Sequence, residues 1–153
     1  VHWFAGAASL LGEYSEAQKA LMDPSLVEIA AEGAGYSLLD YLAAVKAREA
    51  IGVAMNRFHE RYDLLLTPSL PIPAFEAGLE QPPEDEEGRW VDWTPFTYPF
   101  NMSRQPAASV PCGLTAAGLP AGLQIVGPLY GDALVLRAAR AYERTTSFAL
   151  PPL

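Results

Sequence analysis

The chain has 153 residues, 50% of them hydrophobic and 18% charged, so it can bury an apolar core and has the length of a single domain. Its formal net charge of −8 argues against a nucleic-acid-binding surface, which needs clustered Lys and Arg, and only ten such residues are present. No apolar run approaches the roughly 20 residues that span a bilayer, and the first residues do not have the basic and then apolar pattern of a secretory leader. The single cysteine, Cys112, cannot form an internal disulfide. We therefore expect a cytoplasmic protein that does not insert into membranes.

The first third of the chain has helical patterns. Apolar residues spaced three and four apart predict a helix over roughly residues 1–21. The pair Asp23-Pro24 predicts the start of a second helix that ends near Gly33, because an Asp side chain can accept bonds from free backbone N–H groups and Pro fits the first turn.

A third and longer helix is predicted from Ser37 to about Glu60. Asp40 follows Ser37 by three residues, as in a capping box, and an apolar stripe then continues for six or seven turns. Gly52 is the weak point of this helix, because glycine disfavours helical backbone.

The pattern changes after the long helix. Residues 62–68 form a short apolar run closed by proline, which predicts a buried strand of the kind found in parallel sheets. Alternating prolines over 69–75 predict an extended apolar loop, and the acidic, proline-containing stretch 80–89 predicts a surface loop.

The second half combines an aromatic segment with two further strands and a helix. The aromatic segment covers residues 90–101, and its rings are suited either to a substrate pocket or to a core beneath long loops. Residues 107–111 and 121–127 read as two strands of a possible hairpin. Asp132 is expected to cap a closing helix that runs to about Arg144. Together these elements predict an α/β fold in which a partial mixed β-sheet, partly parallel, is flanked by helices.

The chain contains four blocks of residues in a fixed order: Tyr62 to Pro68, Pro99-Phe100-Asn101, Gln105 to Gly113 and Gly118 to Gly127. Together they resemble the C-terminal portion of amidase-signature enzymes, and the resemblance covers nearly the whole chain. The sequence of the aromatic segment is more similar to stand-alone amidases, among them 6-aminohexanoate-cyclic-dimer hydrolase-like enzymes, than to the A subunit of glutamyl-tRNA amidotransferase. That subunit tends to carry an Asp where Thr94 aligns.

The resemblance implies a hydrolase of carboxylic amide C–N bonds that uses a Ser nucleophile, a second Ser and a Lys base. In the family these residues lie in a Gly/Ser-rich segment upstream of the blocks present here. No such segment occurs in this chain, and its only lysines are Lys19 and Lys46. We therefore assign no catalytic residue and expect residues 1–153 to be one domain, the C-terminal fragment of a larger amidase, inactive by itself.

Other catalytic schemes find little support in the sequence. Ser15 and Lys19 lie four residues apart and could share a helix face, but we interpret them as an exposed serine and a solvated lysine rather than a catalytic pair. Cys112 follows an apolar strand without an identifiable base and is expected to be a small buried hydrophobe, and His59 is expected to cap or pack at the end of the long helix. Two separated histidines and one cysteine do not have the spacing of zinc ligands, and the glycines do not form a phosphate-binding motif. We therefore predict no metal and no cofactor.

By the same resemblance, the aromatic segment is the part of the chain that contacts substrate. The residues expected to bind it are Trp93, Thr94, Phe96 and Asn101. Arg104 stands where the family commonly has Gly, and an Arg there is unfavourable if the backbone needs a positive φ.

Three hypotheses about function follow. The chain is part of an amidase whose partner is the N-terminal catalytic part and whose ligand is a small-molecule amide, either as a stand-alone enzyme or as an A-subunit-like part of a tRNA-dependent amidotransferase. Alternatively, it is a non-catalytic module that forms a homo-oligomer through an exposed sheet edge, or an independent hydrolase that depends on Cys112.

Overall fold

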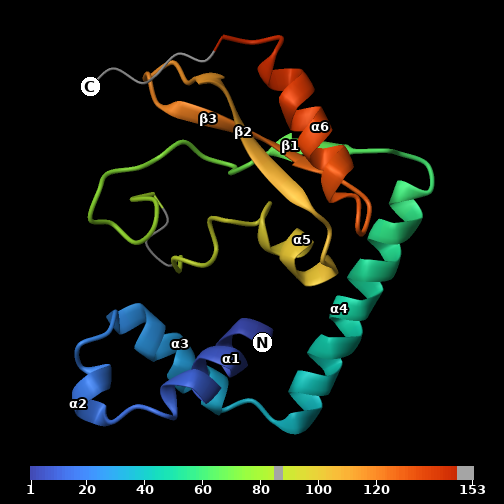
Figure 1. Cartoon of the computed structure of the whole chain (residues 1–153). Helices are drawn as coiled ribbons and strands as arrows, with labels where there is room; N and C mark the ends of the chain where they lie inside the picture. Colours follow the sequence, from blue (N-terminus) through green and yellow to red (C-terminus); the bar gives the residue numbers. More distant parts are fainter. Residues whose placement is uncertain (85–87, 148–153) are drawn as a thin grey trace. The chain divides into compact units, whose positions relative to one another are not determined.

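The computed structural model describes residues 1–84 and 88–147 (Figure 1). Within it the chain divides into two compact units, Val1–Ala50 and Ile51–Leu153. Part of the predicted acidic loop 80–89, namely residues 85–87, lies outside the described residues. The expectation of a single domain stays a prediction.

The first unit is built on helices α1 (His2–Leu11), α2 (Glu16–Lys19) and α3 (Pro24–Ala34). The prediction of one helix over residues 1–21 is wrong, because the chain turns after Leu11 and a new helix begins at Glu16, with Ser15 as its N-cap. The Ser15 side chain accepts a bond from the Gln18 N–H, and the Gln18 side chain accepts one from the Ser15 N–H, which is a complete capping box.

Helices α1 and α3 pack against each other through small and aliphatic side chains, and Ala7, Leu11, Ile29 and Ala30 are buried. The predicted start of α3 is confirmed: the Asp23 carboxylate accepts bonds from the Ser25 N–H (2.9 Å) and the Leu26 N–H (3.2 Å). Gly33 lies where α3 touches α1, and a Cβ there would come within 2.0 Å of the Phe4 carbonyl oxygen. This crossing therefore requires glycine.

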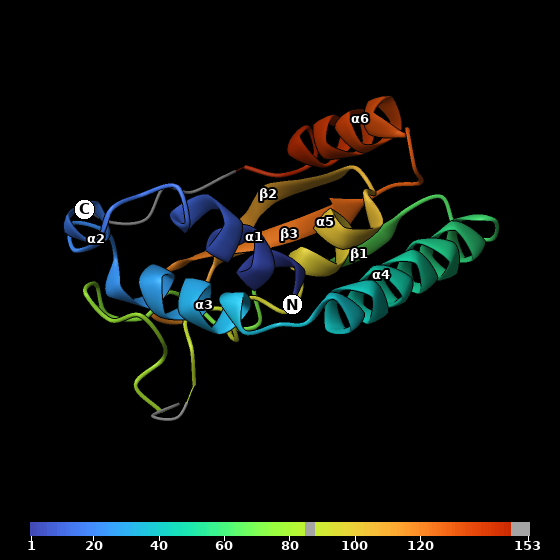
Figure 2. The ribbon, with the colours of Figure 1, turned by 90° about the horizontal axis from the view of Figure 1, so that it is seen from below.

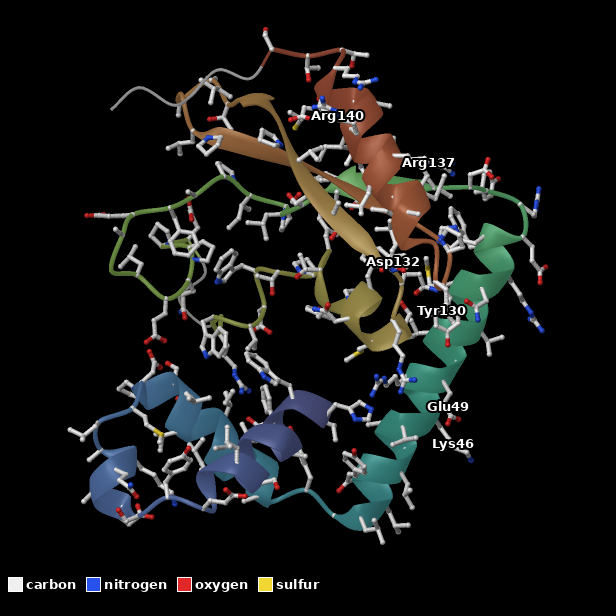
Figure 3. All side chains as sticks on the ribbon, viewed as in Figure 1. Lys46, Glu49, Tyr130, Asp132, Arg137 and Arg140 are labelled. Carbon is white, nitrogen blue, oxygen red and sulfur yellow. The ribbon has the colours of Figure 1, made fainter. Side chains whose placement is uncertain are left out.

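Helix α4 (Leu38–His59) confirms the predicted long helix. The Ser37 hydroxyl and backbone N–H both donate to the Asp40 carboxylate, at 2.7 and 2.9 Å, and these bonds lower the pKa of the Asp40 carboxyl. Lys46 and Glu49 project from the helix into solvent (Figure 3). The start of the apolar stripe is not covered by the described residues, since Leu38 and Leu39 are 72% and 75% exposed. Further along the helix Met55 and Phe58 are half-buried, and no residue of α4 is fully buried.

The second unit contains a sheet of three strands, β1 (Leu65–Pro68), β2 (Ala107–Leu114) and β3 (Pro120–Val126), in the order β1-β3-β2. The predicted hairpin of β2 and β3 is confirmed. The expected parallel pairing is not found among the described strands, since β1 also runs antiparallel to β3. Its apolar run had indicated a strand covered on both faces, but exposure alternates along β1.

Two helices accompany this sheet. Helix α6 (Asp132–Glu143) lies along one face, with Val135 buried against it, and helix α5 (Tyr98–Ser103) precedes β2 (Figure 2). The predicted closing helix is confirmed, but the N-cap is Gly131. Asp132 is the first helical residue and its expected side-chain cap is absent. The α/β fold with a small sheet flanked by helices is therefore established.

Among the described residues, no helix combines the length and the apolar character that a membrane crossing requires.

Two glycine substitutions test the helix packing. Gly33→Ala should lower the free energy of unfolding by about 1–3 kcal/mol, because the new methyl group meets backbone atoms of α1. Gly52→Ala should raise it by about 1 kcal/mol, because no other atom lies within 4 Å of a Cβ built there and alanine favours helix. Urea unfolding followed by circular dichroism measures both changes, and equal stability of the two variants would contradict the described α1–α3 contact.

Candidate functional site

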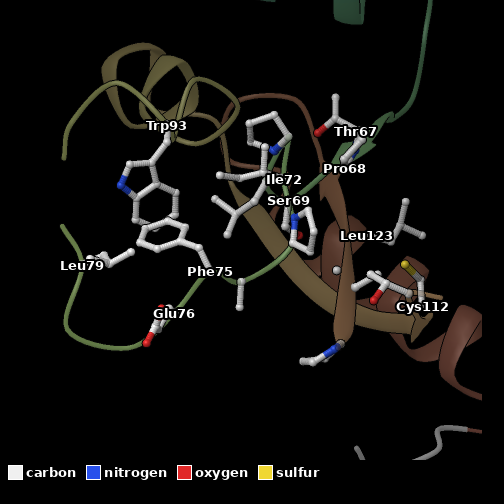
Figure 4. Close-up of a pocket in the computed structure, with 18 of the residues that line it drawn as sticks. Thr67, Pro68, Ser69, Ile72, Phe75, Glu76, Leu79, Trp93, Cys112 and Leu123 are labelled. Atoms are coloured by element: carbon white, nitrogen blue, oxygen red, sulfur yellow. The ribbon is translucent and has the colours of Figure 1, made fainter. Parts of the chain in front are cut away.

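The second unit contains an apolar groove of about 870 Å³ (Figure 4). Its walls are β1 and the Pro-rich loop that follows it, the first half of β3, residues at and just after the end of β2, and one residue of the aromatic segment. Glu76 is the one ionisable carboxylate among the residues that line it. Such a surface suits an uncharged, largely apolar ligand. Large apolar groups in the lining include Leu70, Ile72, Phe75, Leu79, Trp93 and Leu123.

Trp93 is the residue that the aromatic segment contributes to the groove. Its ring meets Phe75 edge to face, with the ring centroids 5.2 Å apart. Its indole N–H donates to the Glu80 carbonyl at 3.1 Å. The indole is therefore fixed at one wall by a ring contact and a hydrogen bond.

The other three residues expected to bind substrate do not line this groove. The Thr94 hydroxyl donates to the Val91 carbonyl (3.4 Å), and the Thr94 carbonyl accepts from the Thr97 hydroxyl (3.2 Å). The Phe96 carbonyl accepts a bond from a glutamine side chain of the sheet. Asn101 lies on α5 with its side chain exposed. The structure thus brings Trp93 to the groove but not the other three, and a role in substrate binding stays a prediction for all four residues.

Two polar clusters beside the groove were not predicted from the sequence. Gln124 is only 6% exposed and bonds to Thr67 and to the Phe96 carbonyl. The hydroxyl oxygens of Ser69 and Ser109 lie 2.6 Å apart across the sheet. The sequence did hold one signal, since a glutamine inside the apolar run 121–127 must find partners if it is buried.

Cys112 is exposed and lines the groove, so the expectation of a buried cysteine is wrong. The β2–β3 register shifts between Pro111 and Gly113, which leaves Cys112 as the extra residue of a β-bulge. Pro111 cannot donate a ladder hydrogen bond and Gly113 has a φ of 131°, so both neighbours favour such an irregularity.

The remaining candidates for catalysis take ordinary structural roles. Lys19 forms an ion pair with Glu16 (2.8 Å), and the Ser15 hydroxyl bonds to Gln18, so the two do not form a nucleophile–base pair. The His59 Nδ1 bonds to the Tyr62 carbonyl (3.0 Å) just beyond the end of α4, as expected for a capping histidine.

The sequence indicated that the backbone at Arg104 could need a positive φ, and the structure confirms that it has one. The residue ends α5 in the left-handed region, with φ 65° and ψ 21°. This conformation normally selects glycine at a helix C-terminus. The turn that joins α5 to β2 is therefore built on an unfavourable residue.

These features define an α/β protein with an apolar groove beside a small antiparallel sheet. Comparison with known proteins identifies the family to which it belongs. The amidase family model matches residues 8–136. The chain belongs to the amidase family, which confirms the resemblance seen in the sequence.

Relatives of the chain include subunits of amidotransferases and amide hydrolases. The chain is 43% identical, over 114 residues, to the A subunit of the glutamyl-tRNA(Gln) amidotransferase of Myxococcus xanthus, and the match covers 74% of this chain and 23% of that protein. A bacterial aryl acylamidase of the amidase signature family superposes with a TM-score of 0.75 and 32% identity, covering 94% of this chain and 31% of that one. The 6-aminohexanoate cyclic dimer hydrolase structure gives 0.72 and 25%, covering 90% and 32%.

The chain thus spans between about a quarter and a third of the length of these proteins. The identities do not favour the stand-alone amidases over the amidotransferase, so the finer expectation of a stand-alone enzyme stays a prediction.

Replacing the strained residue should stabilise the second unit. Arg104→Gly is expected to raise the free energy of unfolding by about 0.5–1 kcal/mol, because glycine adopts the left-handed conformation without a Cβ clash. Arg137→Gly, at an exposed site inside α6, is the matched control and should lower it by about 1 kcal/mol. Thermal unfolding separates the two; a loss of stability in Arg104→Gly would show that the Arg side chain outweighs the backbone strain.

Proposed function

We propose that the chain is the C-terminal part of an amide hydrolase, in which it completes the sheet and shapes the substrate pocket. In this proposal the Ser-Ser-Lys residues come from an N-terminal part of the same enzyme, and the chain by itself is inactive. Membership of the amidase family supports the reaction class. The fraction of the relatives that the chain spans supports its role as one part of a larger protein. Its expected cytoplasmic location remains part of the proposal.

The uncovered surface of α4 supports an apolar partner. Leu38 and Leu39 are 72% and 75% exposed, and Leu42 is 48% exposed. Burying one such side chain contributes about 1.5–3 kcal/mol, so this stripe gives a strong reason for association. In the described residues, β1 pairs only with β3, so its other edge can accept a further strand.

The groove supports a role in substrate binding. It is apolar, it carries a fixed aromatic wall at Trp93, and it lies beside the segment that holds Thr94, Phe96 and Asn101. These four residues form our proposed substrate-binding set. No catalytic function is assigned to any of them.

Complementation tests the proposal as a whole. The purified chain should not hydrolyse aryl or alkyl amides, because it has no activated nucleophile, whereas adding the separately expressed N-terminal part should restore turnover. Turnover by the chain alone, with Cys112→Ser abolishing it, would support the independent hydrolase instead. Self-association with no activity after complementation would support the non-catalytic module.

The stripe on α4 can be tested in the same assay. Leu39→Asp should weaken complementation at least tenfold, because it places a charge in an apolar interface while remaining compatible with the first turn of a helix. Lys46→Asp, on the same helix but at a polar exposed site, is the control and should complement normally (Figure 3). Equal activity of the two variants would remove α4 from the proposed interface.

Trp93 tests the groove. Trp93→Ala in the reconstituted enzyme should raise KM about tenfold for amides with a bulky apolar group, because it removes a large apolar wall. Trp93→Phe keeps an aromatic face and should have a smaller effect. Unchanged kinetics across several amides would reject the assignment.

The second candidate function is that of an A-subunit-like part of a tRNA-dependent amidotransferase, and the 43% identity to the Myxococcus xanthus protein favours it. Thr94 weighs against it, since a threonine cannot supply a negative charge to a substrate ammonium group. Measuring hydrolysis of free glutamine beside that of uncharged aryl amides distinguishes the two. A preference for glutamine would select the amidotransferase.

A further inference from the structure

Gln124 occupies the middle of the sheet. In the register of the three strands it lies between Thr67 of β1 and Ser109 of β2, and it is 6% exposed. Its side chain lies on the face opposite α6. Gly127 abuts Val135 of α6, and side chains alternate along a strand, so Ile125 faces the helix and Gln124 points away from it.

The Gln124 amide uses both of its N–H groups. One donates to the Thr67 hydroxyl at 2.9 Å, and the other donates to the Phe96 carbonyl at 2.7 Å. A backbone carbonyl can only accept, so the Phe96 contact fixes which end of the amide is the nitrogen. A single side chain therefore joins the sheet to the aromatic segment.

The attached segment carries the residue that forms the groove wall. Phe96 lies two residues after Thr94, whose carbonyl accepts bonds from the Thr97 N–H (3.3 Å) and hydroxyl (3.2 Å). This turn fixes the backbone between Trp93 and the start of α5, so holding Phe96 holds Trp93 relative to the sheet. Trp93 then meets Phe75 at the groove.

We propose that Gln124 is a positioning residue: through its bond to the Phe96 carbonyl it holds the aromatic segment on the sheet and so sets the place of Trp93 in the groove. Gln124 itself does not line the groove, and it acts through the segment. Its effect on substrate binding rests on the proposed function. Its effect on the segment does not.

Amide hydrogen exchange on the chain alone tests the structural part. Gln124→Leu keeps an apolar body in the sheet but leaves the Phe96 carbonyl without its donor, so the amides of Thr97 and Phe100 should exchange about tenfold faster. Amides that pair β2 with β3 should keep their protection, which shows that the sheet is still folded. Unchanged exchange at Thr97 and Phe100 would overturn the proposal.

Thr67→Val is the matched control. It removes the other acceptor of the Gln124 amide but leaves the bond to Phe96 in place. Exchange at Thr97 and Phe100 should therefore stay within about twofold of the wild type. Equal acceleration in Thr67→Val and Gln124→Leu would overturn the proposal, because the effect would then come from general loosening of the sheet.

Gln124→Glu adds a readout that a purely space-filling role would not produce. An ionised carboxylate faces the Phe96 carbonyl with acceptors only, whereas a protonated carboxyl can donate one bond. Protection of the segment, compared with wild type at each pH, should return as the pH falls through the titration of the introduced carboxyl group and be lost as the pH rises. A pH-independent difference would overturn the proposed donor role.

Kinetics of the reconstituted enzyme test whether Gln124 affects substrate binding. Gln124→Leu should raise KM for apolar amides about tenfold, as Trp93→Ala does, while kcat changes less, because the segment binds substrate and supplies no reacting group. The double variant should add little to either single one, since both act through the same wall. If complementation fails, the proposed function fails while the exchange result stands; if exchange changes but KM does not, the link to the groove is overturned.

Discussion

The buried amide of Gln124 is the interaction on which the arrangement of the second unit depends. A buried polar side chain must satisfy its donors, and here the Thr67 hydroxyl and the Phe96 carbonyl accept the bonds of the Gln124 amide. Because one of these partners belongs to the sheet and the other to the aromatic segment, satisfying the amide also fixes the segment. The groove wall at Trp93 follows from that attachment.

The exposed apolar side chains of α4 support the proposal that the chain is one part of a larger enzyme. Helix α4 has 22 residues and no fully buried side chain, and the leucines at its start contribute little burial energy until another surface covers them. The same reasoning applies to the outer edge of β1, whose backbone groups lack strand partners in the described part of the chain. Belonging to the amidase family, while spanning at most about a third of the relatives compared, gives a common explanation for both features.

Two local irregularities lie at the ends of β2. The strand begins after Arg104, which holds a left-handed backbone conformation, and it is interrupted by the bulge at Cys112. The bulge places the Cys112 side chain where a regular strand would not, and this cysteine lines the groove. Irregularities of this kind are common beside binding sites, where a strand must redirect a side chain.

The sequence by itself determined the elements whose signals are local. Asp23 and Ser37 begin helices because their side chains accept bonds from nearby N–H groups, and the hairpin of β2 and β3 follows from two apolar runs and a turn between them. The family could also be inferred from ordered blocks of residues, whereas the four binding residues that the resemblance implied stay a prediction. Only the tertiary structure decided what depends on distant partners: the antiparallel pairing of β1, the exposure of Cys112, the attachment of Phe96 to Gln124 and the presence of Trp93, but not Thr94, Phe96 or Asn101, at the groove. Each of these depends on residues tens of positions apart that meet at a particular register, and a pattern of neighbouring residues does not encode that register.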